Sequence, residues 1–249
     1  MIEWILEKFK LALVFLNCVV LYEDCEKIDQ KYFKRLIIVM VFLAVLNYFW
    51  VFISVKSFEG FNVSGRPIFY MVPFAFSTYL CFGIVFLSSC IYLWKKNIKF
   101  DLLIVSGAQV GVVTGAITII VGMIWSYVEW GYFWQWEPRQ TATLIMWVAY
   151  VGLLIFREML DENYPEKRGT LTAIFGIASF PSVPLSNFVV GALHPPPQQT
   201  VLGEGVGGIL MMSFFLIGFI CLILVNLAYR LNEMDFKLRR IRKLKIESL

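Results

Sequence analysis

The sequence predicts an all-α polytopic membrane protein with six transmembrane helices. The chain of 249 residues is 59% hydrophobic, and charged residues make up only 16% of it. Because a soluble domain holds about 25% charged residues, this chain has too little polar surface to coat a water-soluble globule. Its apolar runs are long and continuous, which favours spanning helices over the short alternating segments of a β-barrel.

Six segments are apolar enough to cross a bilayer, which takes about 20 mostly apolar residues in a helix. The expected spans are 36–55, 68–94, 102–124, 141–156, 171–190 and 207–229. The fourth span is short, and it lengthens if Arg139 and Gln140 lie at the membrane interface. An earlier apolar run, 11–22, is too short to cross the membrane and is predicted to be an interfacial or packed amphipathic helix.

The distribution of Lys and Arg predicts the orientation of the spans. With the N-terminus inside, only Lys56, Arg66 and Arg139 of the 22 basic residues fall outside. Since basic residues collect on the cytoplasmic side of a membrane, both termini are predicted to be cytoplasmic. Three loops then face outside, namely 56–67, 125–140 and 191–206.

The chain therefore divides into three parts. Residues 1–35 form a cytoplasmic or interfacial N-terminal segment, 36–230 the six-helix membrane domain, and 231–249 a basic cytoplasmic tail. The tail suits anionic lipid or a cytoplasmic subunit, and ordinary positive-inside bias explains it equally well. The net charge of +4 gives no sign of a nucleic-acid partner, and the five cysteines contain no CxxC pair or metal-ligand spacing.

The second outer loop is the most informative part of the sequence. We call residues 125–141, WSYVEWGYFWQWEPRQT, the tryptophan segment. It contains four tryptophans and three other aromatic residues: Trp125, Tyr127, Trp130, Tyr132, Phe133, Trp134 and Trp136. Tryptophan and tyrosine also form interfacial belts without any ligand, but those residues are usually spread over many helix ends. A flat aromatic surface beside one cation suits a large planar ligand that carries acid groups.

Glu137, Pro138 and Arg139 are typical of the start of a helix. Proline is favoured at the first helical position, and an acidic residue is stabilised near the positive end of the helix dipole. A cation at that end opposes the dipole, so Arg139 is expected to have a partner. The partner is either Glu137 or the carboxylate of a ligand.

His194 is the only histidine in the chain and stands in GALHPPPQQT, within the third outer loop. The prolines behind it stiffen the backbone. Met71, in FYMVPF, lies at the outer end of the second span. Imidazole and thioether groups are axial haem ligands, although a loop histidine is usually a surface residue and a helical methionine is usually core. Both residues and the tryptophan segment are predicted to meet on one membrane face.

The run WGYFWQWEPRQT resembles the WWD signature, roughly WGxxWxWDxRxT, of haem-handling membrane proteins. The length and six-span layout are similar to those of the CcmC family, and more distantly to CcsA-type haem proteins. GRPIFYMVP resembles the family's RIMYxHVP stretch, and GALHPPPQQT resembles its NTLHQG stretch. The resemblance covers residues 66–230.

The resemblance implies that haem b is held on the outer face of the plasma (inner) membrane of a prokaryote. It further implies transfer to the haem chaperone CcmE with the subunits CcmA, CcmB and CcmD, and no catalysis by this chain. Any ATP hydrolysis would belong to a partner. The positions that match the family's haem-binding residues are Trp130, Gly131, Trp134, Trp136, Arg139 and His194, and Glu137 stands where the signature has aspartate.

Met71 occupies the position of the family's first histidine, so bis-histidine ligation within this chain is excluded. Three alternatives remain: an axial pair of His194 and Met71, five-coordinate haem on His194 or with a partner's ligand, and a homologue that no longer binds haem. A small-solute transporter and a purely structural subunit are rival functions. Against a transporter, the predicted spans contain almost no charged residues, which usually mark ion or proton paths.

Overall fold

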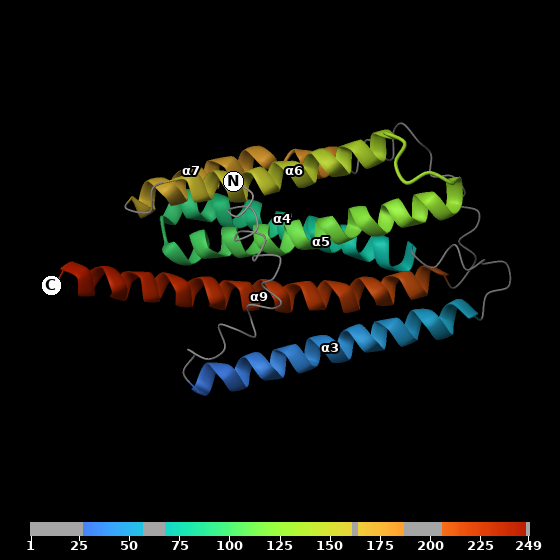
Figure 1. The fold of residues 1–249 in the computed structure, drawn as a ribbon, viewed down its shortest axis with the longest axis horizontal. Helices are drawn as coiled ribbons and strands as arrows, with labels where there is room; N and C mark the ends of the chain where they lie inside the picture. The colour runs from blue at the N-terminus through green and yellow to red at the C-terminus, as the bar shows by residue number, and fades with distance from the viewer. Residues whose placement is uncertain (1–26, 57–67, 161–163, 187–205, 248–249) are drawn as a thin grey trace. The chain divides into compact units, whose positions relative to one another are not determined.

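The computed structural model describes residues 27–56, 68–160, 164–186 and 206–247 (Figure 1). Its principal helices are α3 (Lys27–Lys56), α4 (Ile68–Lys95), α5 (Ile98–Trp130), α6 (Pro138–Met159), α7 (Pro165–Ser179) and α9 (Val206–Glu247). The described residues contain no strand, and six of their helical stretches are long and apolar enough to cross a membrane. The prediction of an all-α protein with six spans is confirmed. The run 11–22 lies outside the described residues.

Two helices are longer than the sequence predicted. α5 continues to Trp130, so the first third of the tryptophan segment is helical rather than loop. α9 continues through the predicted tail as far as Glu247. Within α9, the Glu233 carboxylate forms ion pairs with Lys237, at 3.1 Å, and with Arg230, at 3.8 Å. Ion pairs at i,i+3 and i,i+4 stabilise a helix, and these two do so beyond the apolar part of α9.

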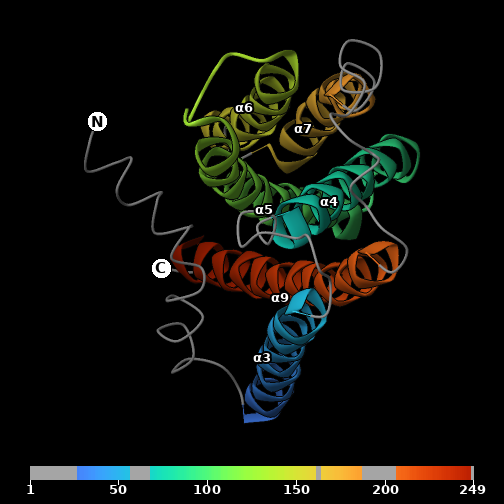
Figure 2. The same ribbon diagram turned by 90° about the vertical axis from the view of Figure 1, so that its right-hand side faces the viewer.

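The described residues divide into two compact units, with the boundary between Leu43 and Ala44. The second unit holds the helix pair α4 and α5, against which α6, α7 and α9 pack (Figure 2). Phe82 on α4 stacks on Tyr150 of α6, with ring centroids 3.5 Å apart and planes 2° from parallel. Gly111 lets Phe82 lie directly against the α5 backbone, because a side chain there would collide with the ring. Both rings belong to one buried hydrophobic cluster, which holds these helices together.

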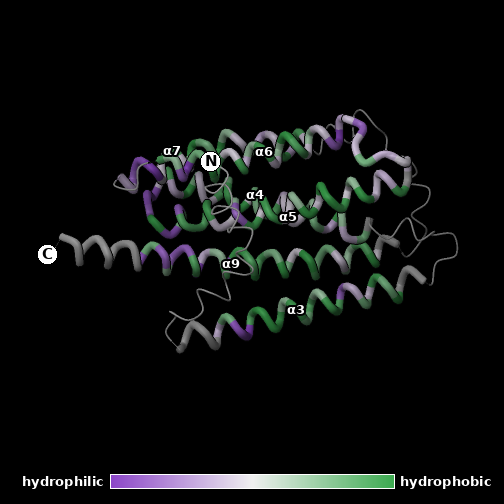
Figure 3. The backbone as a smooth tube through the Cα atoms, viewed as in Figure 1, coloured by the Kyte–Doolittle hydropathy of each residue, from purple (hydrophilic) through white to green (hydrophobic). Residues whose placement is uncertain are grey.

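Polar residues of the second unit gather at the ends of its helices (Figure 3). α5 ends and α4, α6 and α9 begin at the same end, which carries the tryptophan segment (Figures 1 and 2). We call this the loop end. The α4–α5 and α6–α7 connections lie at the opposite end. Met71 and the tryptophan segment therefore share one end of the bundle, as the sequence predicted.

Candidate functional site

The tryptophan segment makes a tight reversal between two antiparallel helices. Gly131 caps α5 in the left-handed conformation, with φ at 79°, and its N–H donates to the Tyr127 carbonyl at 2.9 Å. Glycine adopts this conformation without steric cost, which explains why it follows the last helical tryptophan. Trp136 also has a positive φ, 56°. For a bulky residue this conformation stores about 1–3 kcal/mol of strain and marks a backbone held by its surroundings.

The aromatic rings of the tryptophan segment pack in pairs. Tyr127 stacks on Phe133 with centroids 4.3 Å apart, which joins the last turns of α5 to the reversal. Two edge-to-face tryptophan pairs complete the set: Trp125 with Trp130 at 4.9 Å, and Trp134 with Trp136 at 5.6 Å. Such pairs contribute about 0.5–1.5 kcal/mol each beyond burial. The rings therefore pack as three pairs: one within α5, one between α5 and the reversal, and one within the reversal.

Much of this aromatic surface is accessible. Trp136 is 71% exposed and Tyr132 is 62% exposed. The indole nitrogens of Trp125 and Trp134 are buried, yet neither has a hydrogen-bond acceptor among the described residues. Tryptophan N–H groups usually find a partner when they are buried. The surface thus combines exposed rings with two buried indole N–H groups that have no acceptor among the described residues.

The start of α6 follows the sequence prediction. Pro138 occupies the first helical position and Glu137 is the N-cap residue, whose carbonyl accepts from the Thr141 N–H at 2.9 Å. The Glu137 side chain makes no capping hydrogen bond. Within the described part of the chain, no ion pair joins Glu137 to Arg139. The first of the two partners expected for Arg139 is therefore not in place in the described structure, and the second stays a prediction.

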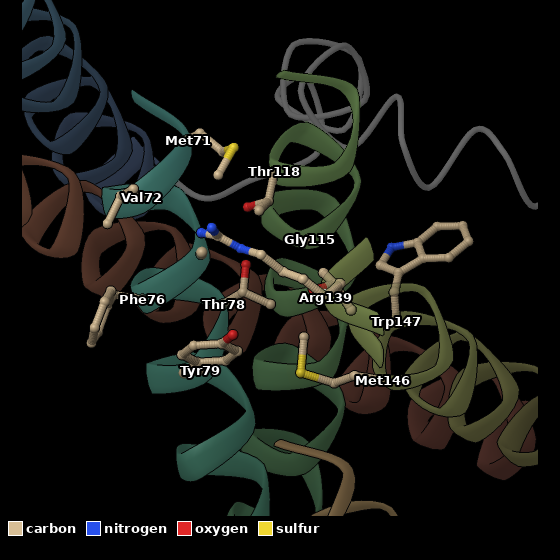
Figure 4. A pocket seen from close by; sticks show the side chains of 12 residues that line it. Met71, Val72, Phe76, Thr78, Tyr79, Gly115, Thr118, Arg139, Met146 and Trp147 are labelled. Carbon is tan, nitrogen blue, oxygen red and sulfur yellow. The ribbon is translucent and has the colours of Figure 1, made fainter. Parts of the chain in front are cut away.

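Arg139 and Met71 line the same pocket. Figure 4 shows the guanidinium extending from α6 into the space between α4 and α5, close to Met71 and Thr78. The pocket has a volume of about 100 Å³ and is lined on its polar side by Thr78, Tyr79, Thr118, Arg139 and Thr143. The Met71 sulfur packs against α5, since a Cβ at Gly122 would lie 3.3 Å from it.

The floor of the pocket is fixed by contacts between α4, α5 and α6. The Thr78 hydroxyl donates to that of Thr114 at 2.9 Å. On the α6 side, the Trp147 indole N–H donates to the Val112 carbonyl at 2.8 Å. Gly115 makes this approach possible, because a Cβ there would lie 2.8 Å from Trp147 Cδ1. The pocket therefore has a rigid base beneath a charged rim.

Two polar features of the described structure escaped the sequence analysis. Gln140, next to Arg139, makes hydrogen bonds within the tryptophan segment. At the opposite end, Arg157 pairs with Asp101 through two N···O contacts of 2.7 Å. Asp101 and Arg157 fall one residue outside the predicted third and fourth spans, and both are buried. Asp101 lies just before one predicted span and Arg157 just after the next. Because consecutive spans are antiparallel, both positions lie at the same end of the bundle, which indicated that the two residues could meet.

His194 lies outside the described residues, so the structure places Met71, Arg139 and the aromatic residues of the predicted site but not the histidine. Within the described ranges, no three histidine, cysteine or acidic side chains are grouped as metal ligands would be.

The fold and the site define a class: polytopic helical membrane proteins whose spans support an exposed tryptophan-rich reversal. A family model described as "CcmC: Heme exporter protein C" matches residues 19–247. The chain belongs to this family.

Individual relatives agree with the family match. The chain is 26% identical over 188 residues to "Heme exporter protein C" of Paracoccus denitrificans, covering 71% of this chain and 77% of that protein. It is 28% identical over 178 residues to a ccmC-like mitochondrial cytochrome c biosynthesis protein of Marchantia polymorpha, covering 70% and 74%. A shorter match, 32% identity over 83 residues, is to "Cytochrome c biogenesis protein CcsA" of a Synechococcus strain, covering 33% and 27%.

Proposed function

We propose that this protein binds haem b on the tryptophan segment and presents it to the haem chaperone CcmE during cytochrome c maturation. The observation that carries the proposal is the pairing of an exposed aromatic surface with the Arg139 guanidinium, which has no counter-ion among the described residues. Haem is a flat apolar ring with two carboxylates at one edge. Membership of the haem exporter protein C family supports haem as the ligand.

The ring face of haem is proposed to stack on the exposed part of the aromatic surface. In the reversal itself, haem is proposed to contact Trp134 and Trp136, whose rings pack edge to face against each other. Because the rings are already packed against one another, binding does not have to assemble them. Preorganisation of this kind lowers the entropic cost of association.

The pocket beside Arg139 is proposed to take one haem propionate. Its volume of about 100 Å³ is far below the ~300–1,000 Å³ of pockets that enclose whole drug-sized ligands. The porphyrin ring must therefore stay outside, on the aromatic surface, while a carboxylate can enter. The hydroxyls of Thr78, Thr118 and Thr143 also line the pocket, but each already donates its proton to an acceptor within the protein. The charged donor for the carboxylate is therefore Arg139. A charged hydrogen bond of this kind contributes about 1.5–3 kcal/mol.

The iron is proposed to be capped by His194, with Met71 as the second axial ligand. Met71 lines the pocket that Arg139 also lines, which supports its place next to a bound haem. A methionine in place of a histidine raises the reduction potential and favours ferrous iron. Five-coordinate haem on His194 is the alternative, and the two differ in the spin state of the iron.

The loop end is proposed to face outside, in the plasma (inner) membrane of a prokaryote, with both termini cytoplasmic. Apart from Arg139, the described basic residues of α4 to α7 and α9 support this orientation, since they lie towards the opposite end of these helices (Figure 1). They are Lys95, Lys96, Lys99, Arg157, Lys167, Arg168, Arg230 and Lys237. The proposed organisation keeps 1–35 as the N-terminal segment, 36–230 as the membrane domain and 231–249 as the tail.

The work of the chain is proposed to be binding and hand-over, without catalysis. CcmA, CcmB and CcmD are the proposed complex partners, and any ATP hydrolysis belongs to them. The open aromatic surface supports hand-over, because an exposed ligand is accessible to a chaperone and an enclosed one is not.

An absorbance experiment tests the proposal. The detergent-solubilised protein is titrated with haem, and its spectrum is recorded in the oxidised and reduced states. We expect a Soret band that saturates with added haem and that is weakened and shifted in His194→Ala. A wild-type protein that gives only the spectrum of haem in detergent would overturn the proposal and favour a transporter or a structural subunit.

A further inference from the structure

Gln140 has no role in the proposed function. Its side chain, near the end of the tryptophan segment, connects Ser126 near the start to Gln135 in the middle. Its Oε1 accepts a hydrogen bond from the backbone N–H of Gln135 at 3.1 Å, and its Nε2 donates to the Ser126 hydroxyl at 3.3 Å. Ser126 lies on α5 and is only 1% exposed. One amide on α6 therefore ties the non-helical reversal to the buried side of the preceding helix.

The hydrogen bond to Gln135 holds the backbone between Trp134 and Trp136, the two tryptophans of the reversal whose rings pack together. Gln135 stands between Trp134 and Trp136, so its N–H belongs to the peptide unit that follows Trp134. Trp136 has a positive φ, a conformation that persists only where neighbouring groups hold the backbone. Among the described residues, Gln140 is the one side chain that hydrogen-bonds to the backbone of 131–136.

We propose that Gln140 is a positioning residue that sets Trp134 and Trp136 for the haem face before haem arrives. The inference rests on the proposed function, because the rings need positioning only if they receive a planar ligand. A neutral amide suits this role, since its oxygen accepts and its nitrogen donates. A reversal that is already ordered loses less conformational freedom on binding, so haem affinity increases.

Fluorine NMR of the haem-free protein, labelled with 5-fluorotryptophan, tests the role directly. Gln140→Met keeps the length of the side chain and removes both hydrogen bonds. Gln135→Met makes the same chemical change on an exposed side chain and keeps the backbone N–H. We expect the signals of Trp134 and Trp136, assigned by single Trp→Phe variants, to shift and broaden in Gln140→Met only. Unchanged signals in Gln140→Met would overturn the proposal.

A conservative variant separates hydrogen bonding from simple packing. The carboxylate of Gln140→Glu can accept from both the Gln135 N–H and the Ser126 hydroxyl, so the wild-type fluorine spectrum is expected to return. If Gln140→Glu disturbs Trp134 and Trp136 as strongly as Gln140→Met does, the hydrogen bonds are not what holds them. Circular dichroism melts of each variant show whether it is folded. The rescue is read without haem, because an added carboxylate would repel propionates.

Haem titration completes the test. We expect Gln140→Met to weaken haem binding about tenfold. This is the change in affinity that corresponds to the free energy of one hydrogen bond, which the variant no longer contributes to ordering the reversal. Gln135→Met should bind like wild type. Disturbed tryptophan signals with wild-type affinity would show that Gln140 does not position the rings for haem, and would overturn the proposal. A wild-type protein that binds no haem overturns the proposed function, while the fluorine spectra still decide separately whether Gln140 holds the reversal.

Discussion

The Arg157 guanidinium meets both carboxylate oxygens of Asp101 at 2.7 Å, in a site where Arg157 is 8% and Asp101 3% exposed. Thr172 on α7 lies 3.2 Å from the same guanidinium, so the pair joins three helices at the end opposite the tryptophan segment. Removal of one partner leaves a buried charge without compensation. The pair therefore fixes how α5, α6 and α7 come together.

Asp101→Asn is predicted to destabilise the protein by about 3–5 kcal/mol, the usual cost of breaking a buried ion pair. The measurement is the midpoint of thermal unfolding in detergent, followed by circular dichroism. Glu158→Gln is the matched control, because Glu158 lies 3.8 Å from Arg168 in a more exposed pair. Exposed pairs contribute at most about 1 kcal/mol. Equal losses in the two variants would contradict the prediction.

Gly115→Ala is predicted to destabilise the α5–α6 contact by about 1–3 kcal/mol, the usual cost of overpacking. The new methyl group would lie 2.8 Å from Trp147 Cδ1 and push the indole away from the Val112 carbonyl. Gly83→Ala is the control, since nothing lies within 4 Å of a Cβ at that position. Thermal midpoints should fall for the first variant and hold or rise for the second. A Gly115→Ala protein as stable as wild type would show that this contact is not tight.

Arg139→Gln is predicted to weaken haem binding tenfold or more, because a charged hydrogen bond contributes about 1.5–3 kcal/mol. The same variant should bind haem dimethyl ester like wild type, since the ester has no carboxylate for the guanidinium to meet. Equilibrium titrations with both porphyrins measure the difference. If Arg139→Gln weakens both ligands equally, Arg139 acts on the shape of the site rather than on a propionate.

Met71→Leu is predicted to convert low-spin, six-coordinate haem to a high-spin, five-coordinate form, because the thioether is lost while the bulk of the side chain is kept. Met71→His should restore the low-spin form at a lower reduction potential, since a histidine then replaces a methionine as ligand. Magnetic circular dichroism and a redox titration measure the two effects. Wild-type haem that is already high-spin, and unchanged in Met71→Leu, would favour ligation by His194 alone.

The spans could be predicted from sequence because the bilayer imposes one simple requirement, a long apolar run, and α4 and α6 lie almost where expected. The end of α5 could not. Five of the six residues 125–130 are aromatic or polar, with Val128 the one aliphatic residue, so hydropathy predicts a loop there. The helix instead continues until Gly131 supplies the left-handed cap. The basic tail was likewise read as a separate segment although it extends α9.

The candidate site could be named from the sequence where residue type alone carries the chemistry, as in the aromatic run and Arg139, whose role in binding stays a prediction. It was not predictable where a contact depends on geometry between helices. Gln140 stands in the same motif, but its role requires knowing that Ser126 faces it across the reversal. The separation of Arg139 from Glu137 also depends on the direction of a long side chain, which now points between α4 and α5 (Figure 4).

Where haem binds is tested most directly by paramagnetic broadening in the protein labelled with 5-fluorotryptophan. Ferric haem broadens fluorine signals close to the iron, and gallium protoporphyrin serves as the diamagnetic control. We predict that haem, but not the gallium porphyrin, removes the signals of Trp134 and Trp136 and leaves that of Trp94, which is 85% exposed near the opposite end of α4. Broadening at Trp94 with sharp signals from Trp134 and Trp136 would contradict haem binding on the tryptophan segment.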